Sequence, residues 1–431
     1  MIHKLCMKCT KENIRRSLEE DTVGRKSLVY RFVSLLENLK ENTVIAVDGG
    51  WGSGKTFFVM QADLVLTEPD PNRQVSHLTV YYDAWKHDAD GDPLLSLIYD
   101  IYTHVHSDYS FDEIKGVEDI SKEAENLPLP KFASSALKIW NFCSGLSVKD
   151  KPFARLKQER ELQDHIHAFL KSVLPEKADR LVIFVDELDR CSPDFAVKLL
   201  ERIKHYFDSD DITFVLSVDA AQLQATIKHH YGQDFRAGAY LDRFFDLRFS
   251  LPPVDAKLYL ACLGLSTEGY SHIVELIRHF SFEMREITRY IRLLQIAQPF
   301  SDYQLSRQDR AMFTTLAFLK QLIVPLMIAL HVHDAEEYRA FISGENPDPL
   351  LTSYDPSLAG EYYDFYLFKE NEPTGITTAR LTLVYEALFG QTKMHVDNRI
   401  GRLYIDESAK NALLQTVSLL SSNSTFGTNA R

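Results

Sequence analysis

The sequence predicts an α/β fold in which a parallel β-sheet is covered by helices on both faces and is followed by a helical domain. Several short apolar runs between residues 43 and 251 are separated by helical patterns, as in parallel sheets buried on both faces. The first run leads directly into a glycine-rich loop, and a later one leads into two acidic residues. From Pro252 to about residue 340 the apolar spacing is helical.

Each element follows from a local pattern. Apolar residues from Leu28 to Leu39 recur at helical spacing, which predicts an amphipathic helix over 26–41. Strands are expected at 43–48, 78–82, 181–185, 212–218 and 247–251. Further helices are expected at 93–106, at about 155–173 and around 195–203. The segment of about 107–150, which contains prolines, is expected to be an insertion in the first domain.

Length and composition limit the class of protein. The chain has 431 residues, of which 45% are hydrophobic and 25% charged, so we expect a globular protein of two or three domains. Its 48 Lys and Arg against 61 Asp and Glu give a net charge of −13, which predicts no clear nucleic-acid surface. Five scattered cysteines and the lack of a secretory signal indicate a cytoplasmic protein. The isolated Cys6/Cys9 pair is not expected to bind zinc.

The most apolar segment of the chain is 311–332. Lys320 and Gln321 divide it into two runs, and neither approaches the roughly 18–20 uninterrupted apolar residues of a spanning helix. We therefore expect a buried helix pair or hairpin here, and no membrane span.

The pattern divides the chain into four regions: an N-terminal extension (1–20), the α/β core (21–253), a helical domain (254–340) and a mainly helical C-terminal region (341–431). In the last region, loops at about 343–375 precede helices near 377–390 and 406–420. Its aromatic and acidic character predicts a surface for protein interaction. The aromatic residues concerned are Tyr354, Tyr362, Tyr363, Phe365, Tyr366 and Phe368.

The glycine-rich loop is the strongest functional signal. Gly49–Thr56 matches the pattern G-x-x-x-x-G-K-[ST] and lies between an expected strand and an expected helix, a context that disfavours a plain glycine turn. Such a loop turns its N–H groups toward phosphate oxygens, and the helix dipole adds to the attraction. Lys55 can reach the β- and γ-phosphates, and the Thr56 hydroxyl can ligate Mg²⁺. The residues expected to bind nucleotide are Gly49, Gly50, Trp51, Gly52, Ser53, Gly54, Lys55, Thr56 and Phe57.

A carboxylate for the metal is expected on a neighbouring strand. The apolar strand 181–185 delivers Asp186 to the carboxyl end of the sheet, where open α/β folds bind ligands. We assign Asp186 to Mg²⁺ together with Thr56, and Glu187 to polarising an attacking water. A surface acidic turn is the alternative, and the order of the two motifs makes it weak.

Several segments together resemble the KAP family of P-loop NTPases over about residues 20–295. Trp51 lies within the phosphate loop, and the other matching segments are 82–88 (YDAWKHD), 185–191 (VDELDRC), 218–223 (VDAAQL) and 240–246 (YLDRFFD). The resemblance implies an ASCE-type fold related to AAA+ and STAND ATPases, with the catalytic carboxylate beside the metal carboxylate. Many members carry membrane helices between the two nucleotide motifs, whereas 57–180 contains none, and Glu187 replaces a frequent Asp.

The resemblance suggests further site residues. Gly24 and Arg25 resemble a turn that lies near the adenine in related ATPases, and a simple helix start is an equal alternative. Asp219, or Ser217, ends the fourth strand where a sensor of the γ-phosphate is expected. Arg243 occupies the chain position of an arginine finger, although a surface arginine is nearly as good an interpretation. In the expected helical lid, 254–340, Arg285 resembles a second sensor, with Arg289 and Arg292 as alternatives.

These residues predict an ATPase that uses ATP and Mg²⁺ to switch conformation or assembly. An arginine acting between subunits implies a homo-oligomer, and the family implies a separately encoded effector in a system such as antiphage defence. The alternative is a STAND-like scaffold that binds ATP and recruits an effector with little turnover. A kinase shares the loop but fits the acidic pair and the trailing helical domain less well.

Overall fold

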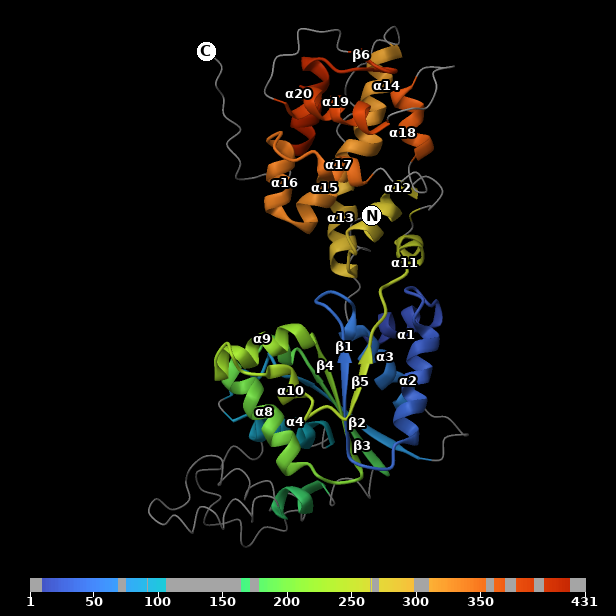
Figure 1. Ribbon diagram of the computed structural model, residues 1–431. Helices are drawn as coiled ribbons and strands as arrows, with labels where there is room; N and C mark the ends of the chain where they lie inside the picture. The colour runs from blue at the N-terminus through green and yellow to red at the C-terminus, as the bar shows by residue number, and fades with distance from the viewer. Residues whose placement is uncertain are drawn as a thin grey trace, which may run out of the picture. The chain divides into compact units, whose positions relative to one another are not determined.

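The computed structural model describes residues 10–68, 75–90, 92–105, 164–170, 178–263, 265, 271–297, 310–353, 360–368, 377–390 and 399–418. Within these residues the chain forms two compact units (Figure 1). We call 25–253 with 10–21 the sheet unit, and 254 onward with 22–24 the helical unit. The insertion predicted at about 107–150 lies outside the described residues, as do Cys6 and Cys9.

A five-stranded sheet in the order β2-β3-β4-β1-β5 forms the centre of the sheet unit. Its strands are β1 (Thr43–Asp48), β2 (His77–Asp83), β3 (Arg180–Asp186), β4 (Ile212–Val218) and β5 (Leu247–Ser250). All neighbouring strands pair in parallel, so the predicted parallel sheet is confirmed. Strands β3 and β4 are buried along their whole length, because both lie inside the sheet and are covered on both faces.

Helices cover both faces of the sheet, as the sequence predicts (Figure 1). Successive side chains of a strand point to opposite faces. Ile183 and Val182 therefore enter two different hydrophobic clusters. The cluster of Ile183 is closed by α4 (Pro93–Val105), α8 (Pro193–Tyr206) and α9 (Ala220–Tyr231). The cluster of Val182 is closed by α1 (Lys11–Glu19), α2 (Lys26–Asn38) and α3 (Lys55–Thr67). Through Leu18 of α1, the predicted N-terminal extension thus contributes to this core.

The register aligns the carboxyl ends of the strands. Asp186 at the end of β3 pairs with Asp83 of β2 and with Ser217 of β4. Asp48 at the end of β1 pairs with Val218, and the glycine-rich loop follows it directly. Because both nucleotide motifs follow strands that end at this edge, the sheet brings them to one place.

The remaining helices of the sheet unit and those of the helical unit are as follows. In the sheet unit these are the 3₁₀ turn η3 (Leu188–Arg190), α10 (Ala237–Leu241) and a helical segment at 164–170. The helical unit begins with α11 (Ala256–Cys262), α12 (Ser271–His279), α13 (Met284–Ile296), α14 (Arg310–Phe318), α15 (Val324–His333) and α16 (Ala335–Ile342). Caps define several starts: the Asp255 carboxylate accepts from two amides of α11, and Glu283 and Glu286 form a capping box on α13.

The apolar segment 311–332 forms one continuous helix, so the expectation of a helix pair or hairpin is wrong. The π-helical turns Leu319–Ile323 join α14 to α15 without a break, because Lys320 and Gln321 are tolerated at exposed positions of the helix. By length and composition Met312–His333 could cross a membrane, but 72% of its most apolar window is buried against other helices of the chain. Such burial is typical of the core helix of a globular unit.

The C-terminal part contains more regular structure than the sequence indicates. Its elements are α17 (Asp348–Thr352), α18 (Gly360–Leu367), α19 (Thr377–Phe389), α20 (Glu407–Ser418) and the antiparallel pair β6 (Arg399–Ile400) and β7 (Leu403–Tyr404). Helices α17 and α18 fall within 343–375, which we expected to be loops. Both are short and flanked by prolines or glycines, so their tertiary packing outweighs the local loop signal.

Most of the described aromatic residues of this region are buried in the core and cannot contribute to the expected interaction surface, which itself stays a prediction. Tyr363, Tyr366 and Phe368 are buried, whereas Phe365 is 55% exposed with Arg402 over its ring. Tyr354 and the side chain of Tyr362 lie outside the described residues. One hydrophobic cluster extends from Ala256 to Leu413, and it therefore includes residues of both predicted regions, 254–340 and 341–431.

Packing of α2 against the sheet yields a stability prediction. Phe32 is fully buried and its ring lies 5.3 Å from Phe58 and 4.9 Å from Phe249. Phe32→Ala should destabilise the sheet unit by about 3–5 kcal/mol, because it removes apolar burial and leaves a cavity. Tyr30→Ala, at a half-exposed position of the same helix, should stay within about 0.5 kcal/mol of wild type. Urea unfolding followed by circular dichroism measures both, and equal midpoints would contradict the assigned packing.

Candidate functional site

The backbone of the glycine-rich loop adopts conformations that its glycines permit. Gly52 and Gly54 have φ angles of +93° and +87°, a region that side chains other than glycine rarely adopt. At Gly49, a Cβ atom would lie 2.7 Å from the Ser53 Oγ. The loop ends at α3, whose first residue is Lys55. The pattern of small residues is therefore required by the path of the chain between β1 and α3.

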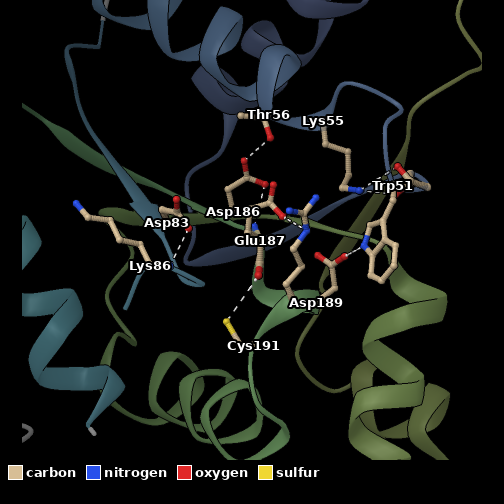
Figure 2. A network of polar contacts seen from close by, with 12 residues as sticks. Trp51, Lys55, Thr56, Asp83, Lys86, Asp186, Glu187, Asp189 and Cys191 are labelled. Atoms are coloured by element: carbon tan, nitrogen blue, oxygen red, sulfur yellow. Dashed lines mark hydrogen bonds and ion pairs between the residues drawn. The ribbon is translucent and has the colours of Figure 1, made fainter. Parts of the chain in front are cut away.

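Lys55 lies inside this loop, with only 8% of its surface exposed. Its Nζ donates hydrogen bonds to the carbonyl oxygens of Gly49 (2.6 Å) and Gly50 (3.2 Å) (Figure 2). Lys55 forms no ion pair with any described residue, so neutral carbonyl groups alone balance a buried positive charge. The nearby Ser53 Oγ is also buried and has no hydrogen-bond partner among the described residues. A buried ammonium group beside a hydroxyl without a partner suits the binding of a phosphate.

Asp186 is held at the opposite side of the site by three donors. Its Oδ2 accepts from the Thr56 hydroxyl (2.6 Å; Figure 2) and from the Tyr81 hydroxyl (2.8 Å). Its Oδ1 accepts from the Glu187 amide (3.0 Å). The side chain is almost fully buried without a cationic partner among the described residues. A carboxylate beside a threonine hydroxyl is a donor set that suits Mg²⁺. Thr56 and Asp186, predicted as metal ligands from distant motifs, are thus brought together.

Tyr81 is a site residue that sequence reasoning missed. It lies near the end of β2, and burial, followed by the negative charge of Asp186, raises the pKa of its hydroxyl well above the ordinary value. The hydroxyl therefore stays protonated and donates to the carboxylate. The usable signal was its position near the end of a strand that, in a parallel sheet, pairs with the acidic strand.

Glu187 follows Asp186 in a left-handed backbone conformation (φ +60°), which costs a non-glycine residue about 1–2 kcal/mol. The Nε of Arg190 forms an ion pair with its Oε2 at 2.5 Å. Burial raises the pKa of the Glu187 carboxyl, the charge of Asp186 raises it further, and Arg190 opposes both. The carboxylate thus stands beside the proposed metal ligand, where a water-polarising base is required.

The turn after the acidic pair connects back to the phosphate loop. The Trp51 Nε1 donates to the Asp189 Oδ2 at 2.5 Å (Figure 2). Trp51 and Trp85 are both about half exposed, and the guanidinium of Arg190 lies near both rings. Trp85 therefore braces Arg190. Cys191 is a buried thiol whose pKa is raised by burial.

Arg25 braces the phosphate loop. Its guanidinium, which is buried, donates to the carbonyl oxygen of Ser53 (2.7 Å) and to that of Pro252. Gly24 precedes it with a φ angle of +70°, so the turn needs glycine. Contact of either residue with adenine stays a prediction, as does nucleotide binding by Phe57, which is half-buried on α3.

The candidate residues at and after the end of β4 lie in different elements. Asp219 caps α9, its Oδ1 accepting from the amides of Ala221 and Gln222. Ser217 is buried at the end region of β4, beside Asp186 in register, and its Oγ has no partner among the described residues. Arg243 is exposed between α10 and β5 and forms no ion pair with the described part of the chain.

The lid candidates lie in the helical unit. Arg285 and Arg289 are exposed on α13, and Arg292 is exposed one turn further on. All three arginines lie on α13, which confirms the helical spacing that the sequence predicts for this segment. Their roles as sensor or finger stay predictions.

The chain is similar to known proteins over parts of its length. An alignment to the "Phage T7 exclusion protein" of Escherichia coli (strain K12) has 21% identity over 257 residues, and covers 53% of this chain but only 34% of that protein. Solved structures of the Aeropyrum pernix ORC2 protein align over 92% of the chain, with 11% identity and a TM-score of 0.35 for the ADPNP-ADP complexes, and 13% and 0.32 for the ADP form. The model of the KAP family P-loop domain matches residues 25–300, more than half of the chain. The protein therefore belongs to the KAP family of P-loop NTPases.

Proposed function

We propose that the protein hydrolyses ATP in the presence of Mg²⁺ and uses the cycle to switch conformation or assembly. The observation that carries this proposal is the hydrogen bond between Thr56 and Asp186, which unites the two nucleotide motifs at the carboxyl edge of the sheet. Lys55 and Glu187 flank it from the loop and from the acidic turn.

Each side chain has a distinct chemical task. Lys55 stabilises the negative charge of the β- and γ-phosphates. Thr56 and Asp186 would hold Mg²⁺, which supplies charge neutralisation at the phosphates when bound. Glu187 accepts a proton from water as the water oxygen bonds to the γ-phosphorus. The bond from that phosphorus to the bridging oxygen breaks, and ADP leaves with the electron pair.

The proposed setting is a cytoplasmic multi-protein system such as antiphage defence, with a separately encoded effector. The support is the name of the phage exclusion relative, of which this chain matches about a third. We further propose a homo-oligomer in which Arg243 of one subunit reaches the site of the next, because this arginine is exposed and unpaired among the described residues.

A STAND-like scaffold that binds ATP with little turnover is the second candidate. Its support is that the buried Lys55 and the Thr56–Asp186 pair can hold nucleotide and metal without any turnover. Multiple-turnover phosphate release, measured with and without a partner protein, separates the two functions. Sustained release supports the ATPase, and tight ATP binding without release supports the scaffold.

Lys55→Ala should weaken ATP binding by about 10- to 100-fold, because a charge-assisted contact to the phosphates is lost. Isothermal titration measures the affinity. Lys86→Ala, an exposed lysine near the same edge, is the control and should bind as wild type. Wild-type affinity in folded Lys55→Ala would remove Lys55 from the site.

Glu187→Gln should bind ATP normally but lower kcat by about 10²- to 10⁴-fold, because an amide cannot accept the proton of the water. The matched control is Glu201→Gln, a half-buried glutamate on α8. Phosphate release at substrate saturation gives kcat. If Glu187→Gln turns over at the wild-type rate, the base assignment is wrong and Asp189 becomes the next candidate.

The proposed finger is tested by mixing two inactive variants. Arg243→Ala subunits keep Glu187, and Glu187→Gln subunits keep Arg243, so a mixed assembly should regain part of the roughly 10³- to 10⁵-fold loss expected without a finger. The control mixture pairs Arg243→Ala with the double variant Arg243→Ala/Glu187→Gln, which supplies no arginine and should stay inactive. Turnover that is independent of protein concentration, with no recovery in the first mixture, would exclude the finger in trans.

A further inference from the structure

Arg190 lies near two tryptophan rings beside the acidic pair. Its guanidinium carbon lies 5.6 Å from the centre of the Trp85 ring and 6.0 Å from that of Trp51. Its amide also closes the 3₁₀ turn on the carbonyl of Glu187 (3.1 Å). Two aromatic rings and a backbone hydrogen bond therefore restrict the arginine, so its guanidinium presents a positive charge at a fixed position.

The ion-pair partner of that charge is Glu187. The ion pair uses Oε2 alone, and Oε1 forms no hydrogen bond or ion pair with the described residues. The carboxylate is thus anchored at one oxygen while the other stays available to a water. The left-handed backbone at Glu187 fixes the direction in which its side chain leaves the main chain. The side chain has three rotatable bonds, so without the ion pair to Arg190 the carboxylate could adopt several positions.

Trp51 connects this anchor to the phosphate loop. Its indole belongs to the loop, and its Nε1 bonds to the buried Asp189, which precedes Arg190 in the same turn. Because Trp51 is about half exposed, this hydrogen bond and the approach to Arg190 hold the indole more than burial does. A change in the loop that moves Trp51 will therefore move two groups of the acidic turn.

We propose that Arg190 is a positioning residue for Glu187, and that Trp51 makes its position depend on the conformation of the phosphate loop. This inference rests on the proposed ATP hydrolysis with Glu187 as base. It assigns a task to the Asp189-Arg190 pair that follows the acidic motif. Arg190 fixes one oxygen of the base, and Trp51 and Asp189 fix the turn that carries Arg190.

Steady-state hydrolysis by the full chain tests the inference. Arg190→Ala should lower kcat by about 10- to 100-fold, the cost of misplacing a catalytic group by about an ångström, while ATP affinity stays within about twofold of wild type. Arg190→Lys keeps the positive charge and should recover part of the loss. Trp51→Phe keeps a ring near Arg190 but removes the donor to Asp189, and should lower kcat by less than Arg190→Ala.

The double variant Arg190→Ala/Glu187→Gln separates positioning from general damage. If Arg190 acts through Glu187, the double variant should turn over at the same rate as Glu187→Gln alone. The matched control is Arg202→Ala on α8, which removes a similar contact to Tyr206 and an ion pair to Asp92 and should keep the wild-type kcat.

Four outcomes would overturn the inference or one part of it. Wild-type kcat in folded Arg190→Ala would do so while leaving the proposed function intact, provided that Glu187→Gln is slow. An Arg190→Ala loss that persists in full in the Glu187→Gln background would show that Arg190 acts elsewhere. Wild-type turnover by Glu187→Gln would overturn the base assignment itself, and the inference with it. Should Arg190→Ala fail to fold, Trp51→Phe with wild-type kcat overturns the dependence on the loop.

Discussion

The parallel register of the sheet is the constraint on which the site depends. Asp186 pairs with Asp83 on one side and with Ser217 on the other, and β1 ends beside β4 at the same edge. A slip of one residue in β3 would turn Asp186 toward the opposite face, away from Thr56. Both β3 and β4 are fully buried, and their apolar side chains alternate between the two hydrophobic clusters. A slip would exchange these side chains between the clusters, so the packing of the core prevents it. The core thus fixes the position of the chemistry.

The two buried charges of the site, Lys55 and Asp186, are each surrounded by neutral polar groups. Lys55 is surrounded by carbonyl oxygens, and Asp186 by hydroxyl and amide donors, so neither buried charge is cancelled by an opposite charge among the described residues. The neutral hydrogen-bonding groups stabilise each charge, and each charge can still attract a bound ion of opposite sign. An anion beside Lys55 and a cation beside Asp186 therefore meet groups that are already oriented for them.

The sequence was informative wherever a short-range pattern controls the structure. All five strands, the glycine-rich loop and the acidic turn could be predicted, because strand periodicity and the loop motif span only a few residues each. Contacts between distant segments could not: the brace from Arg25 to Ser53, and the hydroxyl of Tyr81 on Asp186, join residues that only the folded chain brings together. In the C-terminal part, Tyr363 and Tyr366 lie in an acidic, glycine-containing segment that favours a loop, yet tertiary packing buries both.

The continuous helix Met312–His333 has a consequence for how the chain acquires its structure. The α15 part is buried almost all round by helices from both ends of the helical unit. A helix of this kind has no water-compatible face of its own, so it gains stability only when its neighbours on both sides have been made. The helical unit should therefore form as one cooperative block, only after the ribosome has released α19 and α20. Until then, the apolar segment Met312–His333 is accessible to chaperones.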